Sequence, residues 1–226
     1  MIIVPGSAFI PKAAGDLYWD NVVLLMHMDT TDFVDEKGHT VTKYGNPDSV
    51  GGKFDNALFT DHTVGDFDAL RVTGTPVLDF LSEDMTYEFW FKPTTLATNQ
   101  SIHIIANYFW VQVTTAGAIT VGTYTDAFTW EYFSTGSGVV NTDKYYHIAI
   151  TSTISGNNEI FVDGVKQATR ITPDYYDPGA YTLLLHVTHT DGSNAIKAYT
   201  DELRITKGVA RYTVDFTVPS APFPNS

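Results

Sequence analysis

The 226-residue sequence contains no cysteine, so its fold relies on no disulfide bond, and the redox state of its compartment stays undetermined. Basic residues are also scarce, with 13 lysines and arginines against 26 aspartates and glutamates. The net charge of −13 disfavours nucleic acid and anionic membranes as partners, because both are themselves negatively charged. Cations and neutral ligands remain compatible with this charge.

Long apolar runs and helical patterns are missing as well. The longest apolar run, residues 22–26, is far shorter than the roughly 20 residues that cross a bilayer, so we expect no membrane insertion. Residues 1–7 lack the basic region and the apolar core of a signal peptide, and we expect none. No segment shows a sustained helical period with capping residues, and there are no heptads or internal repeats.

Short alternating segments separated by turn residues fill the chain instead. Residues 85–92 alternate most regularly, with Tyr87, Phe89 and Phe91 on one face. Asp163 and Gly164 are typical of a two-residue hairpin turn. Further strands are predicted at residues 22–28, 40–44, 69–72, 102–107, 109–114, 119–124, 128–134, 145–153, 159–162, 165–168, 181–187 and 195–206. Many short strands with turns between them predict an all-β sandwich or barrel.

The stretch 199–207 places an acid in an unusual position. Strict alternation puts Asp201 on the same face as Leu203 and Ile205. A bare carboxylate on an apolar face is costly, so we expect backbone donors, a cation or water to satisfy it.

Four stretches carry a family resemblance. Residues 201–212, Asp-Glu-Leu-Arg-Ile-Thr-Lys-Gly-Val-Ala-Arg-Tyr, with Phe216 and residues 218–224, resemble the final strand and exit of laminin-G-like, concanavalin A-like domains. Residues 16–29 resemble the opening of modules in bacteriophage tail and virion proteins. Residues 52–58 fit the family's Gly-x-Phe-x-x-Ala-Leu turn, and residues 88–90 fit its Glu-Phe-Trp strand.

This resemblance spans roughly residues 16–224 and implies a concanavalin A-like, two-sheet antiparallel sandwich, or jelly roll, in which the first and last long strands are neighbours. We divide the chain into a lead-in segment (1–15), a laminin-G-like sandwich (16–207) and an extended tail (208–226) that contains three prolines.

Catalysis is not expected. Laminarinase-like enzymes share this architecture and need two carboxylates about 5–5.5 Å apart if they retain configuration. The sequence has six glutamates, and no two of them fall on one face of one predicted strand. There is also no cysteine and no Gly-x-Ser-x-Gly nucleophile motif. His186 and His189 are three residues apart, so on a strand they point to opposite faces and do not share a metal.

Aromatic residues on two predicted strands suggest a ligand site. Tyr108, Trp110 and Gln112 share one face of their strand, and Trp130 alternates with Glu131 on another. Tyrosine and tryptophan on a solvent face stack on sugar rings, and polar neighbours hold the hydroxyls. The candidate set is Tyr108, Trp110, Gln112, Glu88, Trp90, Tyr124 and Trp130. The alternative is that these rings fill an aromatic core or a subunit interface.

The resemblance also implies an ion site where the terminal strands meet. Asp29 closes the first long strand and Asp201 lies in the last, and calcium prefers such oxygen ligands. Calcium is therefore the expected cofactor, with a hydrogen-bond cluster or solvated turn carboxylates as the alternatives.

Together these observations predict a non-catalytic binding module of a phage tail or other virion protein, which recognises a bacterial surface polysaccharide. A structural module that contacts other virion proteins or forms a homo-oligomer is the second interpretation, and a glycan-degrading enzyme is the third. The expected location is the phage particle.

Overall fold

A computed structural model describes residues 15–61, 68–75, 83–105, 108–125, 129–171, 181–186 and 196–226. Within these ranges the chain forms fifteen strands and a single turn of 3-10 helix, η1 (Trp19–Asn21). No helix in the described ranges has the length and apolar character that crossing a membrane requires.

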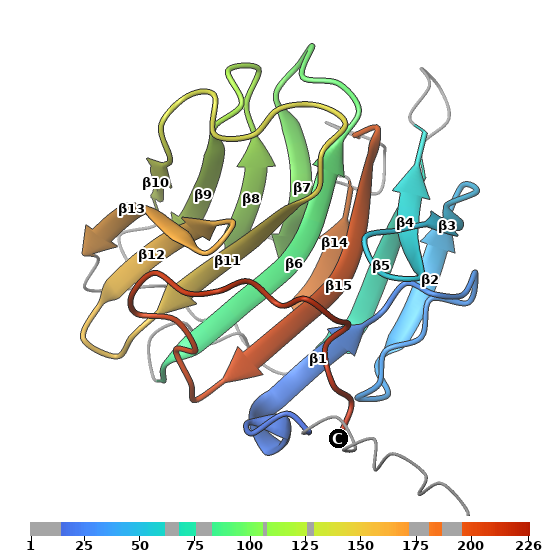
Figure 1. The fold of residues 1–226 in the computed structure, drawn as a ribbon, viewed down its shortest axis with the longest axis horizontal. Coiled ribbons are helices and arrows are strands. Elements are labelled where there is room, and N and C mark those ends of the chain that lie inside the picture. The colour runs from blue at the N-terminus through green and yellow to red at the C-terminus, as the bar shows by residue number, and fades with distance from the viewer. Residues whose placement is uncertain are drawn as a thin grey trace, which may run out of the picture.

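Two antiparallel sheets face each other and confirm the predicted sandwich (Figure 1). Sheet A contains, in spatial order, β13 (Val165–Ile171), β12 (Asn157–Val162), β11 (Tyr146–Ser152), β6 (Met85–Pro93), β15 (Ala198–Lys207), β4 (Asn56–Thr60) and β3 (Asp48–Gly51), with β1 (Val22–Met26) also beside β15. Sheet B contains β10 (Trp130–Ser134), β9 (Ile119–Tyr124), β8 (Phe109–Val113), β7 (Gln100–Ile105), β14 (Tyr181–Leu185), β5 (Ala69–Thr75) and β2 (Thr40–Tyr44).

The core lies between the sheets because each strand sends alternate side chains inward. On β6, Tyr87, Phe89 and Phe91 are fully buried in the core, as their alternation predicts. On β8, Phe109 and Val111 face them from sheet B. Each such side chain contributes about 1.5–3 kcal/mol by leaving water.

Strand β15 organises sheet A. One of its edges pairs with β6, and the other is shared by β4 and β1. Leu203 lies opposite Met26 of β1, which confirms that the first and last long strands are adjacent.

A β-bulge in β15 corrects the predicted position of Asp201. Asp201 pairs with Trp90 and Arg204 pairs with Glu88. Between these two pairs β15 therefore contains one residue more than β6. Glu202 takes a left-handed conformation there, with φ 52°. Directly opposite residues share a face, so Asp201 points outward with Trp90. The prediction that it lies on the apolar side with Leu203 was wrong, because the bulge shifts the alternation by one residue.

The C-terminal segment, residues 208–226, has no strand and crosses the outer face of sheet A (Figure 1). The Phe216 amide donates to the Gly164 carbonyl at 2.8 Å, and the Phe223 amide donates to Glu202 Oε2 at 2.6 Å. This tail therefore covers part of a sheet face that alternation alone would assign to solvent.

Candidate functional site

Four aromatic side chains gather on the outer face of sheet B, on β8, β9 and β10. Trp110 of β8 and Tyr132 of β10 both lie opposite Gly122 of β9. A Cβ atom at Gly122 would come within 2.7 Å of Tyr132 Cε1, so only glycine leaves room for that ring. Tyr132 consequently approaches Trp110 across β9, with ring centroids 6.0 Å apart.

We call these residues the aromatic cluster: Trp110, Tyr124, Trp130 and Tyr132. Trp130 and Tyr132 lie nearly parallel, with 13° between their planes, and Tyr124 meets Trp130 edge-on at 5.5 Å. Tyr132 is 50% exposed, and the other three rings are half-buried. The Trp110 indole donates to Ser101 Oγ at 2.7 Å, which fixes its ring. The cluster thus exposes aromatic ring faces to solvent, and contacts with neighbouring side chains fix the orientation of these rings.

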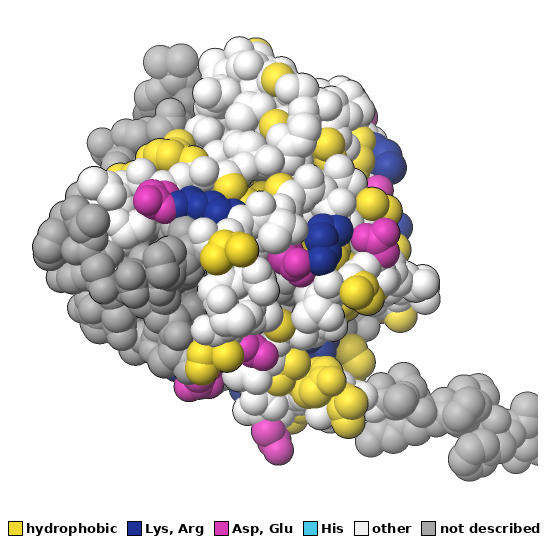
Figure 2. Space-filling model, turned by 90° about the vertical axis from the view of Figure 1, so that its left-hand side faces the viewer, with side chains coloured by type: hydrophobic (Ala, Val, Ile, Leu, Met, Phe, Trp, Pro, Cys, Tyr) yellow, Lys and Arg dark blue, Asp and Glu magenta, His cyan; other side chains and the backbone are white. Residues whose placement is uncertain are grey.

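The edge of the sandwich beside β10 joins the two sheets. Glu131 of β10 forms an ion pair with Arg170 of β13, so this exposed acid is already paired. Figure 2 shows this edge, where acidic and basic side chains lie side by side among separate groups of hydrophobic ones.

Sequence reasoning found part of this cluster and missed the rest. Trp110, Tyr124 and Trp130 were predicted site residues, whereas Tyr132 was left out of the predicted set although it alternates with Trp130. Gly122 carries the missing signal, because a glycine between two aromatic strands indicates a close approach of side chains.

Two other predicted residues lie on or beside the same strand. Gln112 points to the same face as Trp110 but is only 8% exposed. Tyr108 is half-buried and packs against the core. Both support the strand more than they face a ligand.

Glu88 and Trp90 do not join the cluster. They lie on β6 of sheet A, and their side chains are 0% and 3% exposed. Their predicted role beside Trp110 was wrong, because the two strands belong to opposite sheets.

Glu88 instead centres a buried charge network under the tail. Arg204 donates to Glu88 Oε1 from Nε and Nη2 at 2.9 and 2.8 Å, and the Tyr212 hydroxyl donates to Oε2 at 2.9 Å. Asp16 joins the network through Arg204 and Arg211. Burial would raise the pKa of Glu88, but Arg204 and the other cations outweigh it and hold the pKa at about 2. Glu88 is fully buried and both of its carboxylate oxygens accept hydrogen bonds from the chain, so this network is structural.

Asp29 and Asp201 meet at one turn, residues 52–56, before β4. Asp201 Oδ2 accepts the amides of Lys53 and Phe54 at 2.8 and 2.9 Å, and Asp29 Oδ1 accepts the amide of Asn56 at 3.1 Å. The two acids therefore brace the turn together, which matches the predicted hydrogen-bond cluster.

This geometry does not suit a calcium ion. The three contacts come from N–H donors, whereas calcium needs several oxygen ligands that face one point. Across the described residues no group of three or more His, Cys, Asp or Glu side chains is placed to hold a metal. The calcium ion expected at Asp29 and Asp201 is untested, and because these contacts do not suit it we derive no metal-dependent step.

The negative charge of Asp201 is nevertheless unfavourable in the folded chain. Burial raises its pKa to about 7, and the charges of Glu202 and Asp29 add to the rise, while the two backbone donors oppose it. Its second oxygen, Oδ1, is buried and accepts no hydrogen bond from the part of the chain that the structure describes.

A family model described as the concanavalin A-like lectin/glucanases superfamily matches residues 64–211, more than half of the chain. No curated protein matches the chain significantly.

Solved structures of botulinum neurotoxin binding domains share the architecture. The receptor-binding domain of the C/D mosaic serotype aligns with TM-score 0.67 and 13% identity, over 85% of this chain and 49% of that one. A type C structure titled for cell entry through two ganglioside molecules aligns with TM-score 0.66 and 14% identity, over 83% and 48%. A DC-type binding domain in complex with rat synaptotagmin II gives TM-score 0.66, 14% identity and the same coverage. The chain thus spans about half the length of these neighbours, and at this identity the likeness concerns the fold alone.

Proposed function

Because the chain belongs to the concanavalin A-like lectin/glucanases superfamily, we propose that it is a non-catalytic carbohydrate-binding module that uses the aromatic cluster. The observation that carries this proposal is that Trp110 and Tyr132 lie on either side of Gly122 on neighbouring strands, with Trp130 stacked on Tyr132. Held rings with exposed faces suit the apolar faces of sugar rings, and rings fixed in advance lose little entropy on binding.

The charge of the molecule supports a sugar over a charged polymer at this surface. The chain carries −13 net charge, and the acid beside the cluster, Glu131, is neutralised by Arg170. Stacking on a neutral or weakly charged saccharide needs no compensating charge. The structural network around Glu88 supports the non-catalytic part of the proposal, because its carboxylate is closed off beneath the tail.

Fold neighbours offer analogy at a coarser level. One type C neurotoxin structure is titled for its interaction with gangliosides, and a DC-type domain for its complex with synaptotagmin II. Shared folds host many functions, so these neighbours support recognition of a saccharide or a protein as a class and no particular ligand.

The finer part of the proposal is a bacteriophage tail or virion protein that binds a surface polysaccharide of its bacterial host. It rests on the resemblance of residues 16–29 and 201–224 to virion modules. A subunit contact is the competing function, favoured by the position of Trp130 and Tyr132 on β10, an edge strand of sheet B. An exposed edge with apolar side chains can also pair with another chain.

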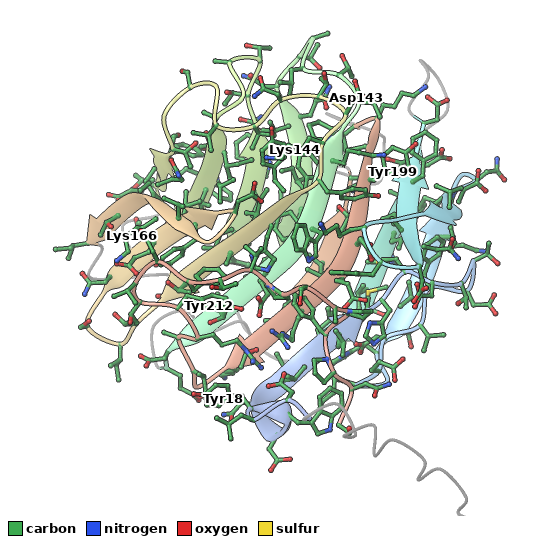
Figure 3. The ribbon with its side chains drawn as sticks, viewed as in Figure 1. Tyr18, Asp143, Lys144, Lys166, Tyr199 and Tyr212 are labelled. Carbon is green, nitrogen blue, oxygen red and sulfur yellow. The ribbon has the colours of Figure 1, made fainter. Side chains whose placement is uncertain are left out.

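Tyr132→Ala tests the proposal with little risk to the fold, because that ring is 50% exposed. We expect the wild-type chain to bind members of a glycan array or purified host polysaccharide, and Tyr132→Ala and Trp130→Ala to weaken binding at least about tenfold. The matched control is Tyr18→Ala, which removes a 37% exposed ring near η1, far from sheet B's aromatic cluster (Figure 3).

Unchanged glycan binding in both variants would refute the role of the cluster. A wild-type chain that sediments as a dimer or larger assembly, and becomes monomeric in Tyr132→Ala without any glycan bound, would favour the subunit contact instead.

A further inference from the structure

A second surface with unusual chemistry lies on the outer face of sheet A, at the end that the tail leaves open. Tyr199 of β15 lies opposite Lys92 of β6, and Tyr145 directly precedes β11 on the far side of Lys92. Figure 3 shows Tyr199 at this end of the sheet, with Lys144 nearby, whereas Tyr212, a residue of the tail, lies toward the other end. We call the row Tyr199, Lys92 and Tyr145 the upper row.

Two lysines at this surface have no anionic partner among the described residues. Lys92 Nζ lies 3.7 Å from the ring centroid of Tyr199 and 4.9 Å from that of Tyr145. Lys53 Nζ lies 4.4 Å from the ring centroid of Trp90, in the next row of the sheet. Every other lysine that the structure describes contacts an oxygen: Lys37, Lys43, Lys144, Lys166, Lys197 and Lys207. In a chain with twice as many acids as bases, two unpaired ammonium groups at one place are unexpected.

Unpaired polar atoms lie beneath these lysines. Trp90 Nε1, Tyr145 Oη and Asp201 Oδ1 are buried and have no hydrogen-bond partner among the described residues. Asp201 and Trp90 face each other across β15 and β6. Burial, followed by the charges of Asp201 and Tyr199, raises the pKa of Tyr145, so its hydroxyl keeps its proton close to the Asp201 carboxylate. Buried polar groups are usually satisfied, and of the thirteen such atoms without a partner among the described residues, these three lie together beside the two lysines.

We propose that the upper row, with Lys53, Trp90 and Asp201, binds a saccharide that carries an acidic group. The sugar ring packs against the half-buried rings of Tyr145 and Tyr199, and its hydroxyls reach the buried Trp90 Nε1 and Asp201 Oδ1 once the exposed Lys53 side chain, which lies over Trp90, moves aside. Its carboxylate lies between the Nζ atoms of Lys53 and Lys92. This site is independent of the aromatic cluster, which lies on the other sheet.

The mixture of charges selects this ligand class over simpler ones. A free cation would meet Lys53 and Lys92, and a small anion would meet the carboxylate of Asp201. A neutral sugar would leave both ammonium groups without the charge-assisted bonds that they can form. A hydroxylated ring with one acid group satisfies all of these atoms at once.

The test uses the indole Nε1–H signal of Trp90 in the NMR spectrum of the whole chain, which has four tryptophans. Loss of one signal in Trp90→Phe assigns it. The probes are oligomers of galacturonic, glucuronic and sialic acid, each paired with its own methyl ester as the uncharged counterpart. We expect at least one acidic oligomer to shift the Trp90 signal and its methyl ester to bind at least about tenfold more weakly.

Variants locate the charge that is recognised. Lys92→Gln and Lys53→Gln should each weaken binding of the acidic oligomer by about tenfold or more, whereas Lys43→Gln, an exposed lysine of β2 in sheet B, should not. Tyr132→Ala should leave the Trp90 shift intact, which separates this site from the proposed function of the aromatic cluster.

The proposal is overturned if no oligomer of the panel shifts the Trp90 signal. Equal affinity for acid and methyl ester overturns it as well, as does a loss in Lys43→Gln that equals the loss in Lys92→Gln. Shifts confined to the signals of Trp110 and Trp130 would support the aromatic cluster and refute this second site.

Discussion

Replacing Asp201 by asparagine should make the folded chain more stable at neutral and alkaline pH. The carboxylate is fully buried, and one of its oxygens accepts the amides of Lys53 and Phe54, while the other has no partner within the described ranges. Asparagine has nearly the same shape, its carbonyl oxygen can accept both amides, and it carries no charge. The substitution therefore keeps the turn and removes the cost of burying an anion.

The size of the effect follows from the pKa. The folded chain holds the Asp201 proton up to about pH 7, whereas the unfolded chain releases it near 3.8. Between these values the folded state binds more protons, so the free energy of unfolding falls as the pH rises. Above pH 7 the ionised group costs the fold about 4 kcal/mol relative to its neutral form. We expect Asp201→Asn to recover about 2–4 kcal/mol at pH 8 and almost nothing at pH 4.

Urea unfolding of both proteins at pH 4, 6 and 8 measures this difference. Other titrating groups, such as Glu88 and the buried histidines, contribute equally to the wild-type chain and the variant, so they cancel in the comparison. A gain of this size corresponds to a rise in Tm on the order of 5–10 °C at pH 8.

Asp201→Ala serves as the control. Alanine removes the charge together with the acceptor, so the amides of Lys53 and Phe54 lose their partner and the variant should gain less than Asp201→Asn at every pH. If Asp201→Asn is no more stable than the wild-type chain at pH 8, or if the gap between them does not change with pH, the carboxylate is not strained as we infer.

Three further outcomes are expected. Glu88→Gln should lower the free energy of unfolding by about 3–5 kcal/mol in urea, because it leaves Arg204 buried beside a neutral partner; a loss below 1 kcal/mol would contradict this. Burial holds the pKa of His103 well below 6.5, so the free energy of unfolding should fall as the pH drops below about 6.5. His103→Phe removes this group and should therefore lower the pH at which the chain unfolds in acid, followed by near-UV circular dichroism. An unchanged midpoint of acid unfolding would argue against it. Melting temperatures in calcium and in chelator should agree, since Asp29 and Asp201 accept backbone amides; a rise of several degrees in calcium that Asp201→Asn abolishes would restore the ion site.

The strands were predictable because their signal is local. Alternation on residues 85–92 correctly predicts a strand, β6 (Met85–Pro93), with Tyr87, Phe89 and Phe91 in the core, although its outward residues Glu88 and Trp90 are buried as well. The pairing of β1 with β15 was predictable only from the family resemblance, because the two strands are far apart in the sequence. Strand β3 (Asp48–Gly51) was missed, since it is short, lies at a sheet edge and ends in glycine.

The site was harder to predict, because it depends on what lies above each sheet. Alternation correctly places Glu88 and Trp90 on the outer face of β6, yet the tail buries Glu88. No local pattern indicates which face a distant segment will cross. The bulge at Glu202 was equally invisible, because one extra residue leaves composition unchanged but reverses the face of Asp201.

The outer face of sheet A therefore contains two environments built from one alternating strand. At the end covered by the tail, Glu88 has Arg204 and Tyr212 as partners, and its charge is fully compensated. At the open end, Lys92 Nζ lies over the rings of Tyr199 and Tyr145, and the Trp90 indole N–H has no acceptor among the residues that the structure describes. The same face thus holds one buried carboxylate that the chain compensates, Glu88, and one that it leaves partly unmatched, Asp201. On this argument the unmatched atoms around Asp201 mark where a partner from outside the chain contributes the missing contacts.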